Sequence, residues 1–128
     1  FAHWLEMGKK LGDKAPKIFN VNWFRTDDEG NFIWPGFGDN MRVINWIIDR
    51  CEGKADAVET AIGYVPRPED IDLTDLDMDI ETLKSILEVD KEIWTKEAAE
   101  IEEHYKKFGD KLPKELRAQL ETLKANLK

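Results

Sequence analysis

The sequence predicts an α+β fold: a short hairpin or small mixed sheet, then one buried central helix, then a helical C-terminal end. Two strand-like runs, at residues 17–24 and 31–34, flank a loop that contains Gly30. The apolar residues of 41–51 cover more than one face, which favours a buried helix. In the last third of the chain, leucine and aromatic residues recur at intervals of three and four, as in amphipathic helices.

The first element is a helix over FAHWLEMGKKLG, which we expect to end at Gly12, with Pro16 shortly beyond it. The runs KIFNVNWF and NFIW follow, and the turn signal at Glu29-Gly30-Asn31 joins them into a predicted hairpin. The segment Pro35-Gly36-Phe37-Gly38 interrupts regular structure.

The central helix is expected over MRVINWIIDRC, with Asp39 or Asn40 as its N-cap and Gly53 at its end. We expect it to be well buried, with Cys51 as inert packing. Residues 54–74 are expected to be loop and short extended pieces, among which IGYVP is the best strand candidate.

Three helices are predicted in the C-terminal third of the chain. Asp79 can cap ETLKSIL, Asp90 can cap a longer helix that stops at Gly109, and Pro113 opens the last one. The last two should pack as an antiparallel pair through apolar residues at helical spacing: Trp94, Ala98, Ile101, Tyr105 and Phe108 in one, and Leu116, Leu120, Leu123 and Leu127 in the other.

Composition excludes several classes of function. With 128 residues and a net charge of −8, the chain suits one domain or a piece of a larger one, and its charge argues against nucleic acid and anionic membranes. Cys51 is the single cysteine, so no internal disulfide forms. No apolar run approaches the roughly 20 residues that span a bilayer, and FAHWLEMGKK lacks the apolar core of a signal peptide. A first residue of Phe suggests that the chain begins within something longer.

Neither a metal site nor a catalytic residue is predicted. Asp75, Asp77 and Asp79 alternate as in a calcium loop, but an EF-hand needs glycine and glutamate where Ile80 and Ile86 stand. The two histidines, His3 and His104, have no neighbours at zinc-ligand spacing. The sequence also lacks G-x-x-x-x-G-K-[ST] and G-x-G-x-x-G, so if the chain touches a nucleotide, we expect it to touch the base.

The stretch NWFRTDDEGNFIWPGFGDN, residues 22–40, concentrates five aromatic rings and is called the aromatic segment below. By composition alone, core and hairpin packing is the favoured interpretation. The alternative is a slot for a flat ligand, because a purine stacks on rings with roughly 1–3 kcal/mol per base and glycines let backbone approach its edge. The amide of Asn40 carries an acceptor and donors, so it could distinguish guanine from adenine.

The run IFNVNWFRTDDEGNFIWPGFGDNMRV closely resembles the guanine-binding stretch near the C-terminus of GTP-dependent phosphoenolpyruvate carboxykinases. The motifs NWFR, F-[LI]-WPGFG-x-N and RV-x-x-W are specific in combination. Similarity continues in HWLEM, APKIF, IGYVP, KEIW and LPKEL, so it covers essentially the whole chain, most strongly residues 18–46.

The resemblance implies a reaction, in which oxaloacetate and GTP give phosphoenolpyruvate, carbon dioxide and GDP, reversibly, in gluconeogenesis. Carried over by position, Phe24, Phe32 and Phe37 stack on guanine and Asn40 addresses the base edge. The contacting segment is Phe37-Gly38-Asp39-Asn40, while Trp23 and Trp34 back the pocket. Asp39 stands where the family is expected to have Glu, which keeps the charge.

The resemblance also implies that residues 1–128 are a C-terminal portion of a larger α/β nucleotide-binding lobe: a guanine-binding segment (18–53), a loop and extended region (54–78) and C-terminal helices (79–128). The family's phosphate loop, reactive cysteine, manganese or magnesium ligands and oxaloacetate-binding arginines lie upstream, and Cys51 does not match the reactive cysteine. We therefore expect the segment alone to be inactive.

The expected partners are GTP or GDP and the upstream part of the same enzyme. The family is typically monomeric, and the resemblance implies the cytoplasm. The alternative is a self-contained aromatic module that binds a peptide or another protein, which would not need Asn40 and the glycine-hinged turn in this arrangement.

Overall fold

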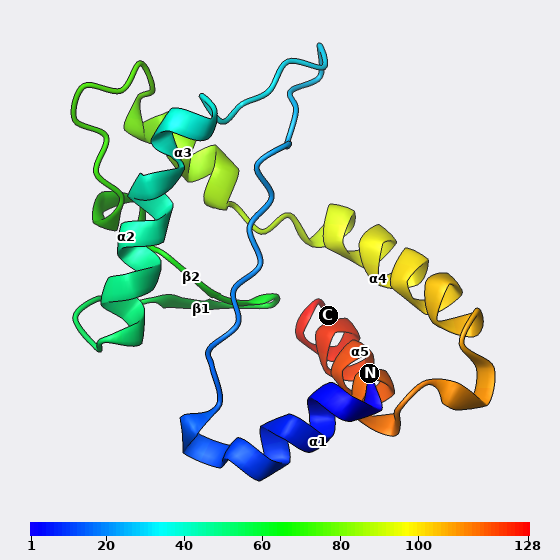
Figure 1. Ribbon diagram of the computed structural model, residues 1–128. Coiled ribbons are helices and arrows are strands. Elements are labelled where there is room, and N and C mark those ends of the chain that lie inside the picture. Colours follow the sequence, from blue (N-terminus) through cyan, green and yellow to red (C-terminus); the bar gives the residue numbers. More distant parts are fainter. The chain divides into compact units, whose positions relative to one another are not determined.

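The computed structural model describes all residues, Phe1–Lys128, as two compact units (Figure 1). The first unit comprises Phe1–Pro16 and Val89–Lys128, and the second comprises Lys17–Glu88. The elements are mostly helical, and the one sheet has two antiparallel strands, as the α+β prediction requires. None of the helices combines the length and the apolar character needed to cross a membrane.

The first unit contains α1 (Ala2–Leu11), α4 (Lys91–Lys106) and α5 (Lys114–Asn126), with short 3-10 turns at Gly12–Lys14 and Gly109–Lys111. The predicted end of α1 and the predicted starts of α4 and α5 are confirmed, whereas α4 ends at Lys106, before the predicted stop at Gly109. Helix α1 stops at Gly12, whose φ of 51° lies in the left-handed region that favours glycine. Helix α4 begins after Asp90, whose carboxylate accepts from the backbone N–H groups of Glu92 (2.7 Å) and Ile93 (3.1 Å).

Helices α4 and α5 pack antiparallel, as their apolar spacing predicts. Lys124 Nζ near the end of α5 lies 2.8 Å from Glu102 in the middle of α4, and Leu127 and Lys128, just after α5, line one pocket with Thr95 and Ala98 near the start of α4. Their buried residues are small and aliphatic: Ala98, Leu120 and Leu127, with Leu112 in the connection. The antiparallel pair of helices α4 and α5 is visible in yellow to red in Figure 1.

The second unit contains α2 (Asn40–Cys51), the strands β1 (Val58–Thr60) and β2 (Gly63–Val65), and α3 (Ile80–Leu87), with 3-10 turns at Phe37–Asp39 and Pro68–Asp70. The two strands pair with Val58 opposite Val65 and Thr60 opposite Gly63.

The core of this unit is built around three side chains that are almost completely buried. These are Trp46 of α2, Ile71 of the loop before α3 and Leu83 of α3, at 5%, 4% and 2% exposure. Partly buried apolar residues surround them: Phe19, Ile47, Ala55, Ala57, Leu73, Met78 and Leu87. A core of this size holds α2 against α3, and the aromatic segment is attached to that frame.

The predicted hairpin over residues 17–34 is wrong. That stretch holds one isolated antiparallel bridge, between Thr26 and Phe32, and no strand, whereas the only hairpin is β1–β2 farther along the chain. Side chains in this stretch compete with strand pairing for backbone N–H groups. Asn22 Oδ1 accepts from the N–H of Phe24, and Asp27 Oδ1 accepts from two N–H groups of its own turn. The IGYVP candidate does contain a strand, β2.

The central helix is less buried than its sequence predicts. Only Trp46 of α2 is buried, and Ile48 is 47% exposed. Cys51, expected to be inert packing, is exposed at the C-terminal end of the helix. The N-cap position is correctly predicted at Asp39, but its side chain makes no cap hydrogen bond. Helix α2 therefore carries more apolar side chains than the small core of this unit buries.

The cap of α3 makes the stability of the fold sensitive to acid. The N–H of Thr82 donates to Asp79 Oδ1 (2.7 Å) and, together with the Thr82 hydroxyl, holds the pKa of this carboxyl below its ordinary value. A lowered folded-state pKa contributes stability that is present above about pH 4 and is lost as the pH falls through the folded-state pKa.

Asp79→Asn should flatten part of this acid-induced loss of stability, because asparagine keeps the oxygen that caps Thr82 but cannot be protonated in this range. Urea unfolding of the chain between about pH 2.5 and about pH 7, a range that includes the carboxyl titration, measures the effect. Asp79→Ala serves as the control and should also lose stability at neutral pH. If stability depended on pH in Asp79→Asn as it does in the wild type, Asp79 would not be the titrating cap described here.

Candidate functional site

The aromatic segment forms a narrow loop whose turn is closed by Asp27. The N–H of Asp27 donates to the carbonyl of Asn31 (2.9 Å), and the Asp27 carboxylate accepts from the N–H groups of Glu29 (3.0 Å) and Asn31 (2.8 Å). Gly30 takes the left-handed conformation that this turn needs, with φ 85°. These hydrogen bonds lower the pKa of the Asp27 carboxyl, above all the one from the Asn31 N–H.

This turn brings two phenylalanine rings into contact. The N–H of Ile33 donates to the carbonyl of Arg25 (3.0 Å), so the two arms of the loop lie beside each other. The rings of Phe24 and Phe32, one on each arm, lie 5.9 Å apart at 64° to one another. Edge-to-face pairs of this kind are favourable, yet both rings face solvent, at 72% and 65% exposure.

The tryptophans of the segment behave in the opposite way. Trp34 is 7% exposed, and Trp23 is half-buried, with their rings 5.9 Å apart. The composition-based expectation of core packing is therefore right for Trp34 and wrong for the three phenylalanines, since Phe37 is 93% exposed. Exposure of three large rings in one short segment is the pattern of a binding surface and not of a core.

The glycine-hinged turn carries Phe37 outward. Gly36 has φ 132° and ψ −168°, a conformation that residues with a side chain rarely adopt. Nothing lies within 4 Å of the Cβ positions of Gly36 and Gly38, so each glycine has open space where a side chain would begin. Phe37 makes no ring contact, and the structure therefore brings together Phe24 and Phe32 but not Phe37.

Asp39 and Asn40 join this turn to helix α2 through their side chains. Asp39 Oδ1 accepts from Arg42 Nε at 2.9 Å, and Arg42 also donates to the carbonyl of Asp72 at 2.7 Å. The Asp39 carboxylate is therefore already paired, which leaves its backbone as the group that could face a ligand. Asn40 Oδ1 accepts from the indole Nε1–H of Trp34 at 2.8 Å.

The cations around the segment are committed to the fold. Arg25 Nη1 donates to the carbonyl of Ile86 at the end of α3 (2.7 Å), and Lys17 Nζ donates to the carbonyl of Cys51 (3.3 Å). With Arg42 also paired, the segment offers aromatic faces and an amide and no free cluster of positive charge. Such a surface suits a flat, uncharged ring better than a polyphosphate.

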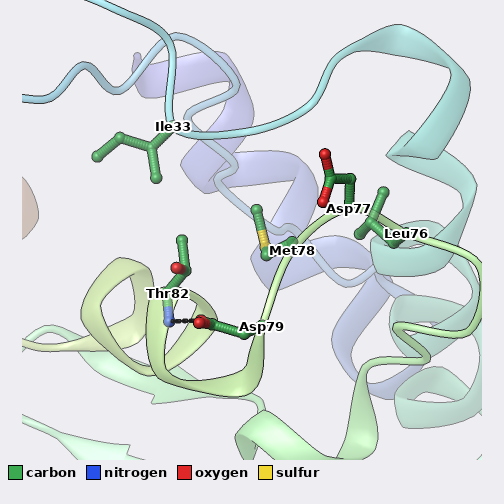
Figure 2. A pocket seen from close by; sticks show the side chains of 6 residues that line it. All are labelled: Ile33, Leu76, Asp77, Met78, Asp79 and Thr82. Carbon is green, nitrogen blue, oxygen red and sulfur yellow. Dashed lines mark hydrogen bonds between the residues drawn. The ribbon is translucent and has the colours of Figure 1, made fainter.

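A separate pocket of about 480 Å³ lies at the start of α3 (Figure 2). Ile33 faces it from the aromatic segment, and its other lining residues are Leu76, Asp77, Met78, Asp79 and Thr82. None of the exposed phenylalanines lines it, and its two carboxylates disfavour an anion. No group of three or more His, Cys, Asp or Glu side chains in the chain could hold a metal ion.

Comparison with known proteins shows which family these features accompany. The family model described as "Phosphoenolpyruvate carboxykinase C-terminal P-loop domain" matches residues 1–126. The chain belongs to this family. The carboxykinase resemblance of the aromatic segment is thereby confirmed for the chain as a whole.

Curated relatives carry the same family name. Proteins named "Phosphoenolpyruvate carboxykinase [GTP]" are 55% identical over 127 residues in Renibacterium salmoninarum, 52% over 126 residues in Arthrobacter sp. (strain FB24) and 49% over 129 residues in Treponema pallidum (strain Nichols). Each match covers 98% or 99% of this chain and 21% of the relative. The chain therefore spans about a fifth of the length of these carboxykinases.

Two features of the site were missed by sequence reasoning. The Trp34–Asn40 hydrogen bond joins residues six positions apart across an irregular turn, where neither the helix nor the strand period applies. The Arg25 bond to Ile86 spans 61 positions, so no local pattern announces it. A signal was available only for Asp39 and Arg42, whose spacing of three suits an ion pair on a helix.

Proposed function

We propose that this chain is the guanine-recognition segment of a GTP-dependent phosphoenolpyruvate carboxykinase, an enzyme that converts oxaloacetate and GTP reversibly into phosphoenolpyruvate, carbon dioxide and GDP. The observation that carries the proposal is the exposure of Phe24, Phe32 and Phe37 in the segment that ends at Asn40, in a chain whose relatives bear the name of that enzyme. On this proposal the segment binds the base, and the rest of the enzyme performs phosphoryl transfer and decarboxylation.

The proposed roles follow from the chemistry of each side chain. Phenylalanine faces stack on any purine, so Phe24, Phe32 and Phe37 supply affinity. The open space at Gly38 lets the turn approach the base edge, with the backbone of Asp39 as a contacting group, and the Asn40 amide supplies discrimination. Trp34 is buried and donates to Asn40, which is consistent with a supporting role.

Metal chemistry is left to the other part of the enzyme in this proposal. The family uses manganese or magnesium, but the chain contains no cluster of carboxylate, histidine or cysteine side chains that fits such an ion. No step of the reaction is therefore assigned to residues of this chain. The upstream part of the enzyme and the guanine nucleotide are its proposed partners, in a cytoplasmic enzyme of gluconeogenesis.

The proposal is tested in the full-length enzyme that carries this segment, with inhibition by GDP and by ADP as the measurement. Asn40→Ala should weaken GDP about 5- to 150-fold and ADP much less, because a base-edge partner worth about 1–3 kcal/mol is lost while stacking is kept. Phe37→Ala should weaken both nucleotides together, because every base presents a π-face.

Ile48→Ala on the exposed side of α2 is the matched control and should change neither inhibition constant. Equal losses of GDP and ADP binding in Asn40→Ala would reduce Asn40 to a structural residue of the helix start. Unchanged binding of both nucleotides in Phe37→Ala, with Asn40→Ala also silent, would instead favour the aromatic interaction module, whose exposed rings contact a peptide or protein.

A further inference from the structure

The hydrogen bond between Trp34 and Asn40 fixes which end of the Asn40 amide faces outward. The indole Nε1–H is a donor and has no acceptor capacity, so its partner at 2.8 Å must be the amide oxygen. A reversed amide would set its NH2 group against the indole N–H and leave two donors facing each other. The orientation of this amide is therefore set by the chain itself, before any ligand binds.

The indole that imposes this orientation is held firmly. Trp34 is 7% exposed and its ring lies 5.9 Å from that of Trp23, while Asn40 is the first residue of α2. The bond is partly buried, and hydrogen bonds gain strength where water is excluded. The Asn40 Nδ2 amino group makes no hydrogen bond within the chain, so both of its protons are available to a ligand.

An amide that offers NH2 distinguishes purines by the group at position 6. Guanine carries the acceptor O6 at that position, whereas adenine carries the donor N6–H2. A donor facing O6 forms a hydrogen bond, and a donor facing N6–H2 leaves both groups unpaired. Rotation of the amide by half a turn would restore the match to adenine, but it would break the bond to Trp34.

We propose that Trp34 is a positioning residue for base selectivity: its indole N–H holds the Asn40 amide oxygen, so that the amide presents its NH2 to O6 of a 6-oxopurine. This inference rests on the proposed role of the segment in guanine recognition. It extends that role to a residue that does not touch the base, and it defines the ligand class by O6. Hypoxanthine, which has O6 but lacks the 2-amino group, belongs to the same class.

The test uses Trp34→Phe in the full-length enzyme, with the inhibition constants of GDP, IDP and ADP. Phenylalanine keeps an aromatic ring in the buried site and removes the N–H donor. The preference for GDP and IDP over ADP should fall about 5- to 30-fold, because the freed amide can offer its NH2 to O6 or its oxygen to N6–H2. In an Asn40→Ala background, Trp34→Phe should have no further effect on the ratio of GDP to ADP binding.

Trp46→Phe is the matched control. Trp46 is buried in the same unit, at 5% exposure, but its Nε1–H has no hydrogen-bond partner, so the substitution removes an indole without breaking such a bond. Its GDP to ADP ratio should equal that of the wild type. The ratio does not depend on the folded fraction of the enzyme, and benzothienylalanine at position 34, which keeps the bicyclic shape without the N–H, gives a second variant if Trp34→Phe folds poorly.

The outcomes separate the two proposals. If Asn40→Ala lowers the selectivity for GDP but Trp34→Phe and its benzothienyl analogue do not, the positioning role is overturned and the proposed function stands. Equal weakening of GDP, IDP and ADP in Trp34→Phe would likewise overturn it, since that pattern reports packing alone. If Asn40→Ala itself leaves selectivity unchanged, the guanine-recognition role of Asn40 fails, and the inference fails with it.

Discussion

Asn40→Asp should abolish the proposed preference of the full-length enzyme for guanine and shift it towards adenine. Aspartate is nearly isosteric with asparagine and keeps an oxygen that can accept from Trp34 Nε1, so the 2.8 Å bond can persist. The outward group changes from a donor to an oxygen acceptor. That oxygen faces O6 of guanine as one acceptor against another, whereas it can accept from N6–H2 of adenine.

This substitution should have a larger effect on selectivity than any removal of a side chain, because it replaces a favourable contact by an unfavourable one. The ratio of ADP to GDP inhibition constants should fall by about 100-fold, which is a loss for GDP and a gain for ADP of roughly 1–2 kcal/mol each. Titration with GDP, IDP and ADP measures the change.

Asn45→Asp makes the same chemical change at an exposed position of α2 and should leave the ratio unaltered. A retained preference for GDP in Asn40→Asp would mean that the outward end of the Asn40 side chain does not meet position 6 of the base.

Leu83→Ala should destabilise the second unit by about 2–5 kcal/mol, the range for removing a fully buried leucine. Leu83 is 2% exposed and packs in one cluster with Trp46 of α2 and Ile71 of the preceding loop. The cavity left behind would lie between α2 and α3, the two helices to which the aromatic segment is attached. Urea unfolding of the chain, followed by tryptophan fluorescence, measures the change.

Ile80 lies on the same helix and is 38% exposed, so Ile80→Ala is the matched control. It should cost less than about 1 kcal/mol, because a partly exposed side chain loses little transfer free energy and leaves no closed cavity. Similar losses in the two variants would show that the cluster around Leu83 does not hold this unit together.

The sequence predicts those parts of this fold that depend on local chemistry. Caps and stops at Gly12, Asp79 and Asp90 lie where expected, because a cap needs only the residue itself and the next turn of backbone. The pairing of α4 with α5 is equally readable, since apolar residues at helical spacing in two adjacent helices leave one simple way to bury them.

The sequence-based predictions are wrong where apolar side chains are exposed and not buried. Phe24 and Phe32 lie in the predicted strands, and composition favoured a core role for both of them and for Phe37. All three rings are exposed, so they provide no buried face to fix a strand register. The wide apolar surface of α2 predicted burial that only Trp46 attains. For the candidate site, residue types were readable, whereas the Trp34–Asn40 contact depends on a turn geometry that only coordinates reveal.

The turn at Gly36 has a consequence for handedness. Its φ of 132° and ψ of −168° are nearly the mirror image of the extended conformation that L-residues adopt freely, and nothing lies within 4 Å of a Cβ built there. The position therefore excludes L-amino acids by chirality and not by size. A D-alanine introduced by chemical ligation would adopt this backbone conformation without strain and would lower the conformational entropy of the unfolded chain. L-alanine, its mirror image, would force the backbone between Trp34 and Asn40 into a different conformation.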